Sequence, residues 1–517
     1  MKRTANRPGS AALVGSPPRP CDPAGAWPAA LLAALVLIAG CPGKPPAPAD
    51  PGPAQRGADA VAAGSPGVAQ PIGDDGRLVS LPNVTAEMLS AEFWIGRMDA
   101  PDEVRMSPDE VATWSGLVLQ ESNGALQDLA AFPESLGRKE LVERTTSWDP
   151  GDRPLYRDGT EIAREELEAV ALNRNAAAVH EENPVHLGAT WQRCELRMWP
   201  TEKPAFETPD DRHFDVFQAT ALDPAEPLVV LHESTDGRWL FVRAYNCDGW
   251  LLREQVARVP DRRDWLSLVA PERFLVVIGS ELLLGPDCGS DGLVGTRFLM
   301  GARLPLWPDP APSTPQGRGS PGHHVVRLPE RSPDGSARFV ATMIPMSDDV
   351  RIGVLPYTRA NVIRQAFRML GRPYGWGGLQ GGVDCSAFIA GVYRTLGIGL
   401  PRNSGRQELV PGHRILLGGP EELDSVPPAS SLFLKGHTLL YLGEADGRHY
   451  AIHAMSAYMA DGEKVPVFGV VVSDLSLIRT SGKSLDESLT SAVDMMPPGT
   501  PERGSDSAAL PGAPAHE

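Results

Sequence analysis

A cysteine in the C-terminal third of the chain, Cys385, stands where a helix would position a nucleophile. The residues Phe388, Ile389, Val392 and Leu396 are apolar at helical spacing, so Cys385 falls in the first turn of an amphipathic helix. Unpaired N–H groups and the positive dipole end of a helix start favour a thiolate over a thiol. On position alone, a buried structural cysteine is the safer interpretation, and a neighbouring base is needed to change it.

Two histidines downstream supply that base. His437 opens one apolar run and His453 lies in a second, and the Asp446-Gly447 pair between them predicts a β-hairpin. The histidines are 16 residues apart, so they share a sheet face if the loop holds an odd number of residues or a bulge restores the parity. One imidazole can then accept the thiol proton while a third polar group fixes its tautomer. His449 competes with His453 for the third role but lies nearer the turn.

A metal site is the other chemistry that these residue types allow. Cys385, His437, His453 and His449 lack the close ligand pairs that zinc sites use. The sequence therefore predicts neither a metal nor another cofactor.

The elements around Cys385 predict an α+β domain over residues 351–483. Thr358 can cap a helix that Gly371 closes, and a glycine-rich loop then leads to the Cys385 helix. The hairpin with the two histidines follows, so one helix start and one sheet face have to meet at the site.

Short β-type runs separated by Asp-Gly turns precede this domain and predict two small β barrels. A Ser-x-Asp-Gly motif followed by a Phe-Val pair occurs at Ser234 and again at Ser332, and a Trp-Pro pair stands before each copy. We assign the barrels to residues 176–260 and 261–350. Cys194 and Cys247 of the first barrel could form a disulfide or remain buried thiols.

A helical region over residues 78–175 precedes the barrels. Its helix start at Ser107-Pro108-Asp109-Glu110 combines a capping Ser, a Pro at the first helical position and a Glu that completes a capping box. Residues 42–77 and 484–517 are rich in Pro, Gly and Ala, which predicts a disordered linker and a disordered tail.

Residues 1–41 have the features of an export signal. Lys2 and Arg3 precede an apolar stretch that ends in Ile38-Ala39-Gly40-Cys41 and resembles a bacterial lipobox. This stretch is shorter than the roughly 20 residues of a membrane-spanning helix, which favours a cleaved signal. The resemblance implies that Cys41 is lipidated and anchors the protein to the periplasmic face of a bacterial membrane, with the outer membrane as the expected location. The alternative is a short apolar stretch within a disordered leader.

The charge of the chain excludes nucleic acid as a partner. Its formal net charge is -17, and no run of Lys and Arg of the kind that binds phosphates is present. We expect a monomer.

In order and spacing, residues 373–454 resemble the NlpC/P60 peptidase family, although Ala387 stands where the family usually has Gly. The matching motifs are Pro373-Tyr374-x-Trp376-Gly377-Gly378, Asp384-Cys385-Ser386, Pro401-Arg402-Asn403-Ser404 with Gln407, Gly436-His437 and Ile452-His453-Ala454. The resemblance implies a papain-like fold with Cys385 as nucleophile, His437 as base and His453 as the orienting third residue. The barrel segment with Asp248-Gly249-Trp250-Leu251 resembles bacterial SH3 (SH3b) domains of cell-wall hydrolases.

Family members of this architecture cleave γ-D-glutamyl to diamino acid bonds in peptidoglycan stem peptides, so the resemblance implies peptidoglycan or muropeptides as partners and a role in wall turnover or recycling. Tyr374, Asp384 and Ser386 match positions that hold the free α-amine of an N-terminal L-Ala in such members. Alternatively, Asp384 caps the Cys385 helix and Tyr374 packs in the core. The other candidate function is a wall-binding SH3b lipoprotein with a silent peptidase domain, which the complete set of Cys385, His437 and His453 argues against.

Overall fold

The computed structural model describes residues 80–496, apart from residues 309, 310, 312, 315 and 318. The predicted signal segment with Cys41 and the predicted linker lie outside the described residues. Within the described part, no helix combines the length and the apolar character needed to cross a bilayer.

The N-terminal region is largely helical, as predicted. Helix α2, Pro108–Glu121, begins with a capping box in which Ser107 Oγ accepts from the Glu110 N–H at 3.3 Å and Glu110 Oε2 accepts from the Ser107 N–H at 2.7 Å. The other elements are η1 Glu87–Leu89, α1 Ala91–Ile95, β1 Ser135–Gly137, α3 Arg138–Thr146, β2 Tyr156–Arg157, β3 Thr160–Glu161, α4 Arg164–Asn173, η2 Ala176–Ala178 and β4 Glu182–Pro184.

The apolar side chains of this region do not form a core of their own. Trp94 and Trp114 pack in the hydrophobic core of the C-terminal helices, whereas Leu141 packs with the strands that follow. The helical region therefore packs against two parts of the protein, the C-terminal helices and the strands that follow the helical region.

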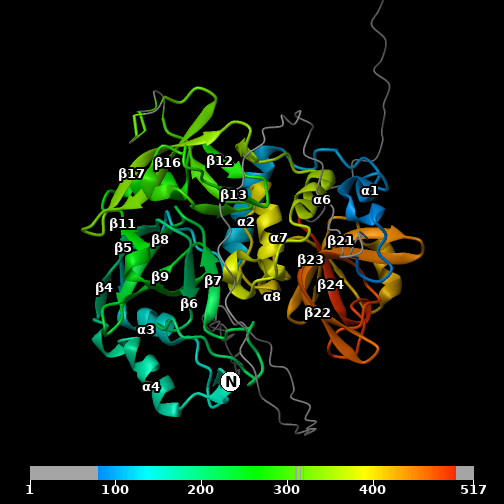
Figure 1. Ribbon diagram of the computed structural model, residues 1–517, viewed down its shortest axis with the longest axis horizontal. Coiled ribbons are helices and arrows are strands. Elements are labelled where there is room, and N and C mark those ends of the chain that lie inside the picture. The colour runs from blue at the N-terminus through cyan, green and yellow to red at the C-terminus, as the bar shows by residue number, and fades with distance from the viewer. Residues whose placement is uncertain (1–79, 309–310, 312, 315, 318, 497–517) are drawn as a thin grey trace, which may run out of the picture. The chain divides into compact units, whose positions relative to one another are not determined.

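A seven-stranded antiparallel sheet comes next, in the order β11-β5-β8-β9-β10-β6-β7 (Figure 1). Trp239 and Trp250 pack in its hydrophobic core and are almost completely buried. Cys194 and Cys247 are buried thiols that form no disulfide with each other. The strands are β5 His186–Thr190, β6 Cys194–Arg197, β7 Gln218–Leu222, β8 Pro227–Glu233, β9 Trp239–Arg243, β10 Asp248–Leu252 and, after η3 Arg253–Gln255, β11 Val256–Arg258.

The second β region consists of three smaller sheets, β15-β12-β18, β13-β14 and β16-β17. Both Ser-x-Asp-Gly motifs form hairpin turns, the first between β8 and β9 and the second between β16 and β17, and Gly237 and Gly335 have φ values of 69° and 84° that favour glycine. The elements are α5 Arg262–Val269, β12 Phe274–Val277, β13 Glu281–Leu283, η4 Asp291–Leu293, β14 Arg297–Leu299, β15 Arg303–Pro305, β16 His323–Arg331, β17 Ala337–Pro345 and β18 Val350–Ile352.

The C-terminal part is a six-stranded antiparallel sheet with helices packed against it, in the order β19-β24-β20-β21-β22-β23 (Figure 1). Thr358 caps the first helix through the Asn361 N–H, as predicted. The helices are α6 Arg359–Arg368, η5 Trp376–Gly381, α7 Cys385–Thr395, α8 Ser404–Gln407, η6 Pro420–Ser425 and η7 Asp486–Ser488; the strands are β19 His413–Leu416, β20 Ser431–Leu434, β21 His437–Ala445, β22 Arg448–Ala460, β23 Glu463–Asp474 and β24 Leu489–Asp494. Together they form the mixed α+β fold expected from the sequence.

The prediction of a disordered tail from residue 484 is wrong for its first part. Residues 489–494 form β24, which pairs with β19 on one side and β20 on the other. Ala492 and Val493 are fully buried there. The Pro- and Gly-rich composition that suggested disorder belongs to the residues after this strand.

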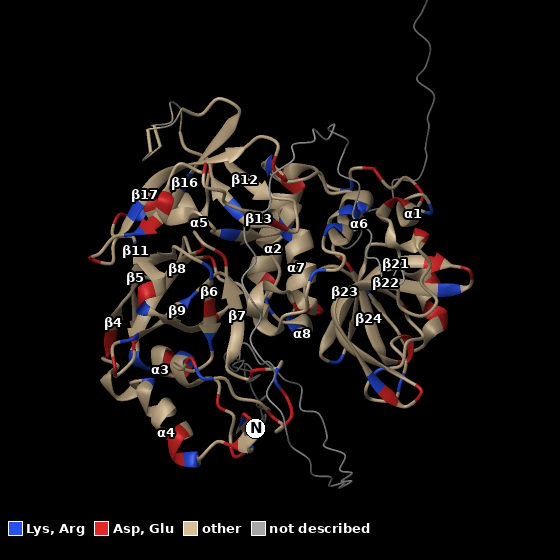
Figure 2. Cartoon of the chain, in the orientation of Figure 1, with Lys and Arg blue, Asp and Glu red and all other residues tan. Residues whose placement is uncertain are grey.

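The hairpin of β21 and β22 has the irregularity that the histidine spacing required. Asp446 and Gly447 form the turn, and a bulge interrupts the pairing between Tyr441 and Gly443. Figure 2 shows that Lys and Arg positions are interspersed with Asp and Glu positions along the described part of the chain.

Candidate active site

Cys385 is the first residue of α7, as predicted, and the helix start is fixed by its neighbour. Asp384 is the N-cap, and its Oδ1 accepts from the Ala387 N–H at 2.9 Å. The Thr438 backbone N–H lies close enough to the Cys385 sulfur to lower the pKa of the thiol. Because Thr438 follows His437 directly in β21, the start of α7 meets the sheet at the catalytic histidine expected from the sequence.

His437 and His453 form a hydrogen bond, with Nε2 of the first 2.7 Å from Nδ1 of the second. Nε2 of His453 lies 2.9 Å from Ser473 Oγ on β23, and both of these residues are fully buried. The result is a chain of polar groups, His437, His453 and Ser473, across three strands. With Nε2 of His437 engaged, Nδ1 is the ring nitrogen that could accept a proton from Cys385.

Burial dominates the protonation states at the site. It raises the pKa of the Cys385 thiol to about 12, and the Asp384 charge acts in the same direction, against the Thr438 N–H. It lowers the pKa of His437 to about 3, with the positive charge of Arg479 acting in the same direction. The expectation that the helix start favours a thiolate is therefore not met in the resting protein, because desolvation outweighs the helix terminus. The resting pair is a neutral thiol and a neutral imidazole.

Asp384 is ionised and fully engaged by neighbouring groups. Burial opposes its ionisation, but Arg402 lowers the pKa of the carboxyl below its ordinary value. Nη2 of Arg402 lies 2.5 Å from Oδ2 and Nη1 lies 3.2 Å from Oδ1, and the Gly377 N–H donates to Oδ2 at 3.0 Å. This arrangement matches the alternative in which Asp384 caps α7.

Ser386 and Tyr374 differ in their surroundings. Ser386 Oγ is 2.9 Å from Nη1 of Arg402 and 3.1 Å from Oδ1 of Asp384, and the residue is buried. Tyr374 is half-buried against Phe468, with ring centroids 6.2 Å apart. Its pKa is raised well above the ordinary value by burial first and then by the charges of Cys385 and Asp384, so it lies near both. The role of Tyr374, Asp384 and Ser386 in binding an amine stays a prediction.

The first β unit contacts the loop before Cys385 directly. Gln218 Nε2 donates to Gly377 O at 2.9 Å, and Trp376 Nε1 donates to Asp215 O at 3.1 Å. Arg402 Nε donates to Thr220 Oγ1 on β7 at 2.7 Å. Strand β7 therefore contacts both the loop before Cys385 and Arg402, which pairs with Asp384.

Three residues that contact or influence the site residues were not predicted from the sequence. Arg402 belongs to a matched motif, but its pairing with Asp384 follows only from the packed structure. Ser473 could have been found only by knowing the register of β22 with β23, where His453 pairs with Val471. Arg479 had no sequence signal.

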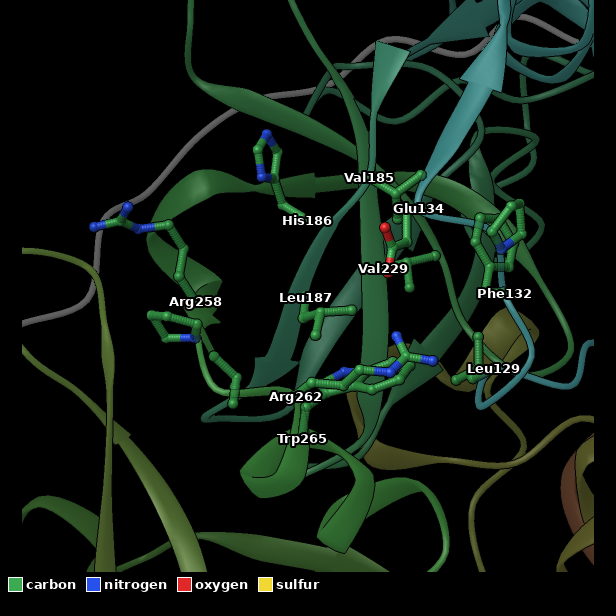
Figure 3. Close-up of a pocket in the computed structure, with 13 residues that line it drawn as sticks. Leu129, Phe132, Glu134, Val185, His186, Leu187, Val229, Arg258, Arg262 and Trp265 are labelled. Carbon is green, nitrogen blue, oxygen red and sulfur yellow. The ribbon is translucent and has the colours of Figure 1, made fainter. Parts of the chain in front are cut away.

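A cavity of about 540 Å³ lies elsewhere, lined by the first β unit, α5 and residues 129–134 of the N-terminal region (Figure 3). Leu187, Val229 and Trp265 give it an apolar wall, and Arg262 and Glu134 are also at its edge. None of the predicted site residues lines it, so it is separate from the chemistry at Cys385.

Comparisons with known proteins match two parts of the chain. Residues 204–252 match the SH3 domain of the SH3b1 type, and residues 371–461 match the NlpC/P60 family. A gamma-D-glutamyl-L-lysine dipeptidyl-peptidase of Bacillus subtilis (strain 168) is 28% identical over 148 residues, which are 28% of this chain and 45% of that protein. The match thus spans less than half the length of this relative.

The solved structures that are similar to the chain include two NlpC/P60 proteins. An NlpC/P60 endopeptidase from Photobacterium damselae subsp. piscicida has a TM-score of 0.62 at 17% identity, covering 78% of this chain and 97% of its own. An NlpC/P60 family protein from Bacillus cereus ATCC 10987 has a TM-score of 0.38 at 20% identity, covering 54% of this chain and 83% of its own. The first of these shows that the fold is shared.

Proposed function

We propose, from the membership of residues 371–461 in the NlpC/P60 family and of residues 204–252 in the SH3b1 type of SH3 domain, that this protein is a cysteine peptidase of peptidoglycan stem peptides. The bond that it cleaves joins the γ-carbonyl of a D-glutamyl residue to a diamino acid. The name of the Bacillus subtilis relative, a γ-D-glutamyl-L-lysine dipeptidyl-peptidase, supports this substrate class. The activity belongs to wall turnover or recycling.

The observation that carries the proposal is the hydrogen-bonded chain from His437 through His453 beside the Cys385 helix start. His453 has both ring nitrogens bonded, so it holds the His437 ring in one orientation. A structural cysteine would need no such ordered base. A silent wall-binding domain would not need one either.

The mechanism follows from the neutral resting pair. Cys385 gives its proton to Nδ1 of His437 as the sulfur attacks the γ-carbonyl, because neither charged partner is stable alone in the buried site. The His437 imidazolium then donates that proton to the leaving amine of the diamino acid. Water, deprotonated by His437, hydrolyses the thioester and restores the thiol. His453 keeps accepting from Nε2 of His437 throughout.

The test is cleavage of defined muropeptides by the full-length protein, with the products identified by mass spectrometry. The wild type should release an L-Ala-γ-D-Glu dipeptide from a free stem peptide, and Cys385→Ala should release none while keeping its circular dichroism spectrum. If Cys385→Ala still cleaves the peptide, Cys385 is not the nucleophile. Binding to peptidoglycan without cleavage by the wild type would support the silent wall-binding alternative.

We also propose that Cys41 carries a lipid anchor and places the enzyme at the periplasmic face of a membrane. The Ile38-Ala39-Gly40-Cys41 sequence supports this location. Metabolic labelling with a palmitate analogue should mark the wild type and leave Cys41→Ser unmarked, and equal labelling would refute the anchor.

A further inference from the structure

The loop between β23 and η7 has two basic residues, Arg479 and Lys483, that the mechanism does not use. The Arg479 N–H donates to Lys483 O at 2.8 Å, and the Gly482 N–H donates to Arg479 O at 2.9 Å. Gly482 has a φ of 84°, which closes the turn. The two cationic residues therefore stand opposite each other at the base of one tight turn.

Apolar contacts fix this loop on the sheet face to which His437 belongs. Leu477 and Leu485 pack in the same hydrophobic cluster as Leu439 and Met455. Alternate side chains of a strand project to one face, so His437, two residues before Leu439, lies on the face that the loop covers.

A backbone bridge then brings the turn to the end of the sheet where β21 begins. The Met459 N–H donates to Ile478 O at 2.8 Å. Leu440 of β21 pairs with Ile452 of β22. Counted along both strands from this pair, Met459 lies beyond the residue of β22 that faces the first residue of β21. Arg479 follows Ile478 directly and is thereby held near the catalytic end of β21.

The charge of Arg479 has no carboxylate to balance it among the described residues. Burial lowers the pKa of its half-buried guanidinium, and no acidic group offsets this effect. By contrast, the buried Arg402 and Arg359 of the same domain pair with Asp384 and Asp494. The positive charge of Arg479 also acts on His437 more strongly than the negative charge of Asp384 does. A partly buried cation beside a catalytic base suits an anionic group of the ligand.

We propose that Arg479, together with Lys483, forms a subsite for a substrate carboxylate next to the scissile amide. The inference rests on the proposed function, because a D-glutamyl residue linked through its γ-carbonyl necessarily has a free α-carboxylate. The diamino acid on the leaving side offers a second carboxylate. A guanidinium binds either one through two parallel N–H donors, and the flexible ammonium of Lys483 adds charge.

The experiment compares three peptides of the sequence L-Ala-γ-D-Glu-diamino acid. One has both carboxylates free, one has the glutamyl α-carboxylate amidated and one has the diamino acid carboxylate amidated. The wild type should lose about 10- to 100-fold in kcat/KM on one amidated peptide, because a charge-assisted bond is lost. The peptide that suffers this loss identifies the carboxylate that is bound.

Arg479→Gln should lower kcat/KM on the free-acid peptide by a similar factor and remove the discrimination between the peptides. Arg479→Lys should keep part of the kcat/KM on the free-acid peptide and part of the discrimination between the peptides. Lys483→Gln should lower kcat/KM less than Arg479→Gln does. Arg263→Gln removes an exposed cation from α5 and should change nothing, which controls for net charge.

The subsite is refuted if the wild type cleaves all three peptides equally well or if Arg479→Gln discriminates as the wild type does. A wild type that cleaves none of them instead contradicts the proposed function. The affinities of Cys385→Ala for the three peptides, measured by calorimetry, then decide the subsite separately. Tighter binding of the free acid that disappears with Arg479→Gln supports it, and equal binding overturns it.

Discussion

The side chains that would prepare Cys385 for attack in the proposed mechanism depend on one another for their proton positions. Nδ1 of His437 can accept the thiol proton only if its own proton is on Nε2, where it donates to Nδ1 of His453 at 2.7 Å. His453 must then have its proton on Nε2, and Ser473 Oγ at 2.9 Å is the acceptor. In the proposed mechanism, Ser473 is thus a positioning residue that acts through His453 and fixes the tautomers of both imidazoles.

Ser473→Ala is expected to reduce kcat about 10-fold, because the loss of one hydrogen bond leaves the His453 tautomer unfixed. KM should change little, and Ser473→Thr should restore most of the activity because it keeps the hydroxyl. The measurement is kcat as a function of pH for the three proteins.

A double mutant separates this role from a loss of packing. In a His453→Ala background, Ser473→Ala should cost nothing further, whereas an undiminished 10-fold loss there would mean that Ser473 acts by another route. His449→Ala offers a matched control on the same sheet. Its ring bonds the Tyr441 hydroxyl at 2.7 Å, away from the histidine chain, so kcat should be unchanged.

Among the elements, β24 has the greatest effect on whether the site can form. It lies between β19 and β20, and β20 in turn pairs with β21, whose first residue is His437. Arg359 of α6 forms a buried ion pair with Asp494 at the end of this strand, with 2.6 Å between Nη2 and Oδ2. The last strand in sequence is therefore part of the support for β21 and for His437 at its start.

A chain that ends at residue 484 should fail to fold its C-terminal domain, because β19 and β20 would lose their common neighbour and Arg359 would be left as a buried charge without Asp494. A chain that ends at residue 496 keeps the strand and should retain its thermal midpoint and its activity. Thermal unfolding of the two purified proteins checks this, and a stable, active shorter chain would show that β24 is dispensable.

The sequence predicted the elements whose signals are local. The Ser107 capping box, the Thr358 cap, the position of Cys385 at a helix start and the hairpin with a bulge are confirmed by the structure. The sequence did not reveal β24, because six residues next to a Pro- and Gly-rich end give a weak strand signal and the pairing partners are distant in the chain. The contacts of Ser473, Arg402 and Arg479 were beyond reach for a related reason, since each depends on strand register or on loop packing.

Over the whole molecule, the site combines groups from parts that are far apart in sequence. Gln218, Asp215 and Thr220 of the first β unit bond Gly377, Trp376 and Arg402 of the C-terminal domain. In the same domain, burial lowers the pKa of both histidines, to about 3 for His437 and well below the ordinary value for His453.

Stability should fall as the pH drops from about 6.5 toward about 3. The unfolded chain takes up protons on these histidines near their ordinary pKa of 6.5, while the folded chain resists them, so the unfolded state binds more protons in that window. The pKa of Asp384 is also lowered in the folded protein, so protonation of this carboxyl reduces the stability further at lower pH. Urea unfolding at a series of pH values measures the effect. His453→Asn should show a shallower dependence, and a flat profile for the wild type would contradict the assignment.

The bonds between β7 and the loop before Cys385 also decide what can be exchanged between proteins of this kind. If the peptidase were transplanted onto another targeting domain, the Gly377 carbonyl, the Trp376 indole N–H and Arg402 Nε would lose their partners in β7 and the residues before it. The C-terminal domain therefore depends on the first β unit and cannot be moved to another protein without it. A chimera that keeps residues 204–252 with it should retain turnover, while one with a foreign barrel would have to rebuild these three contacts.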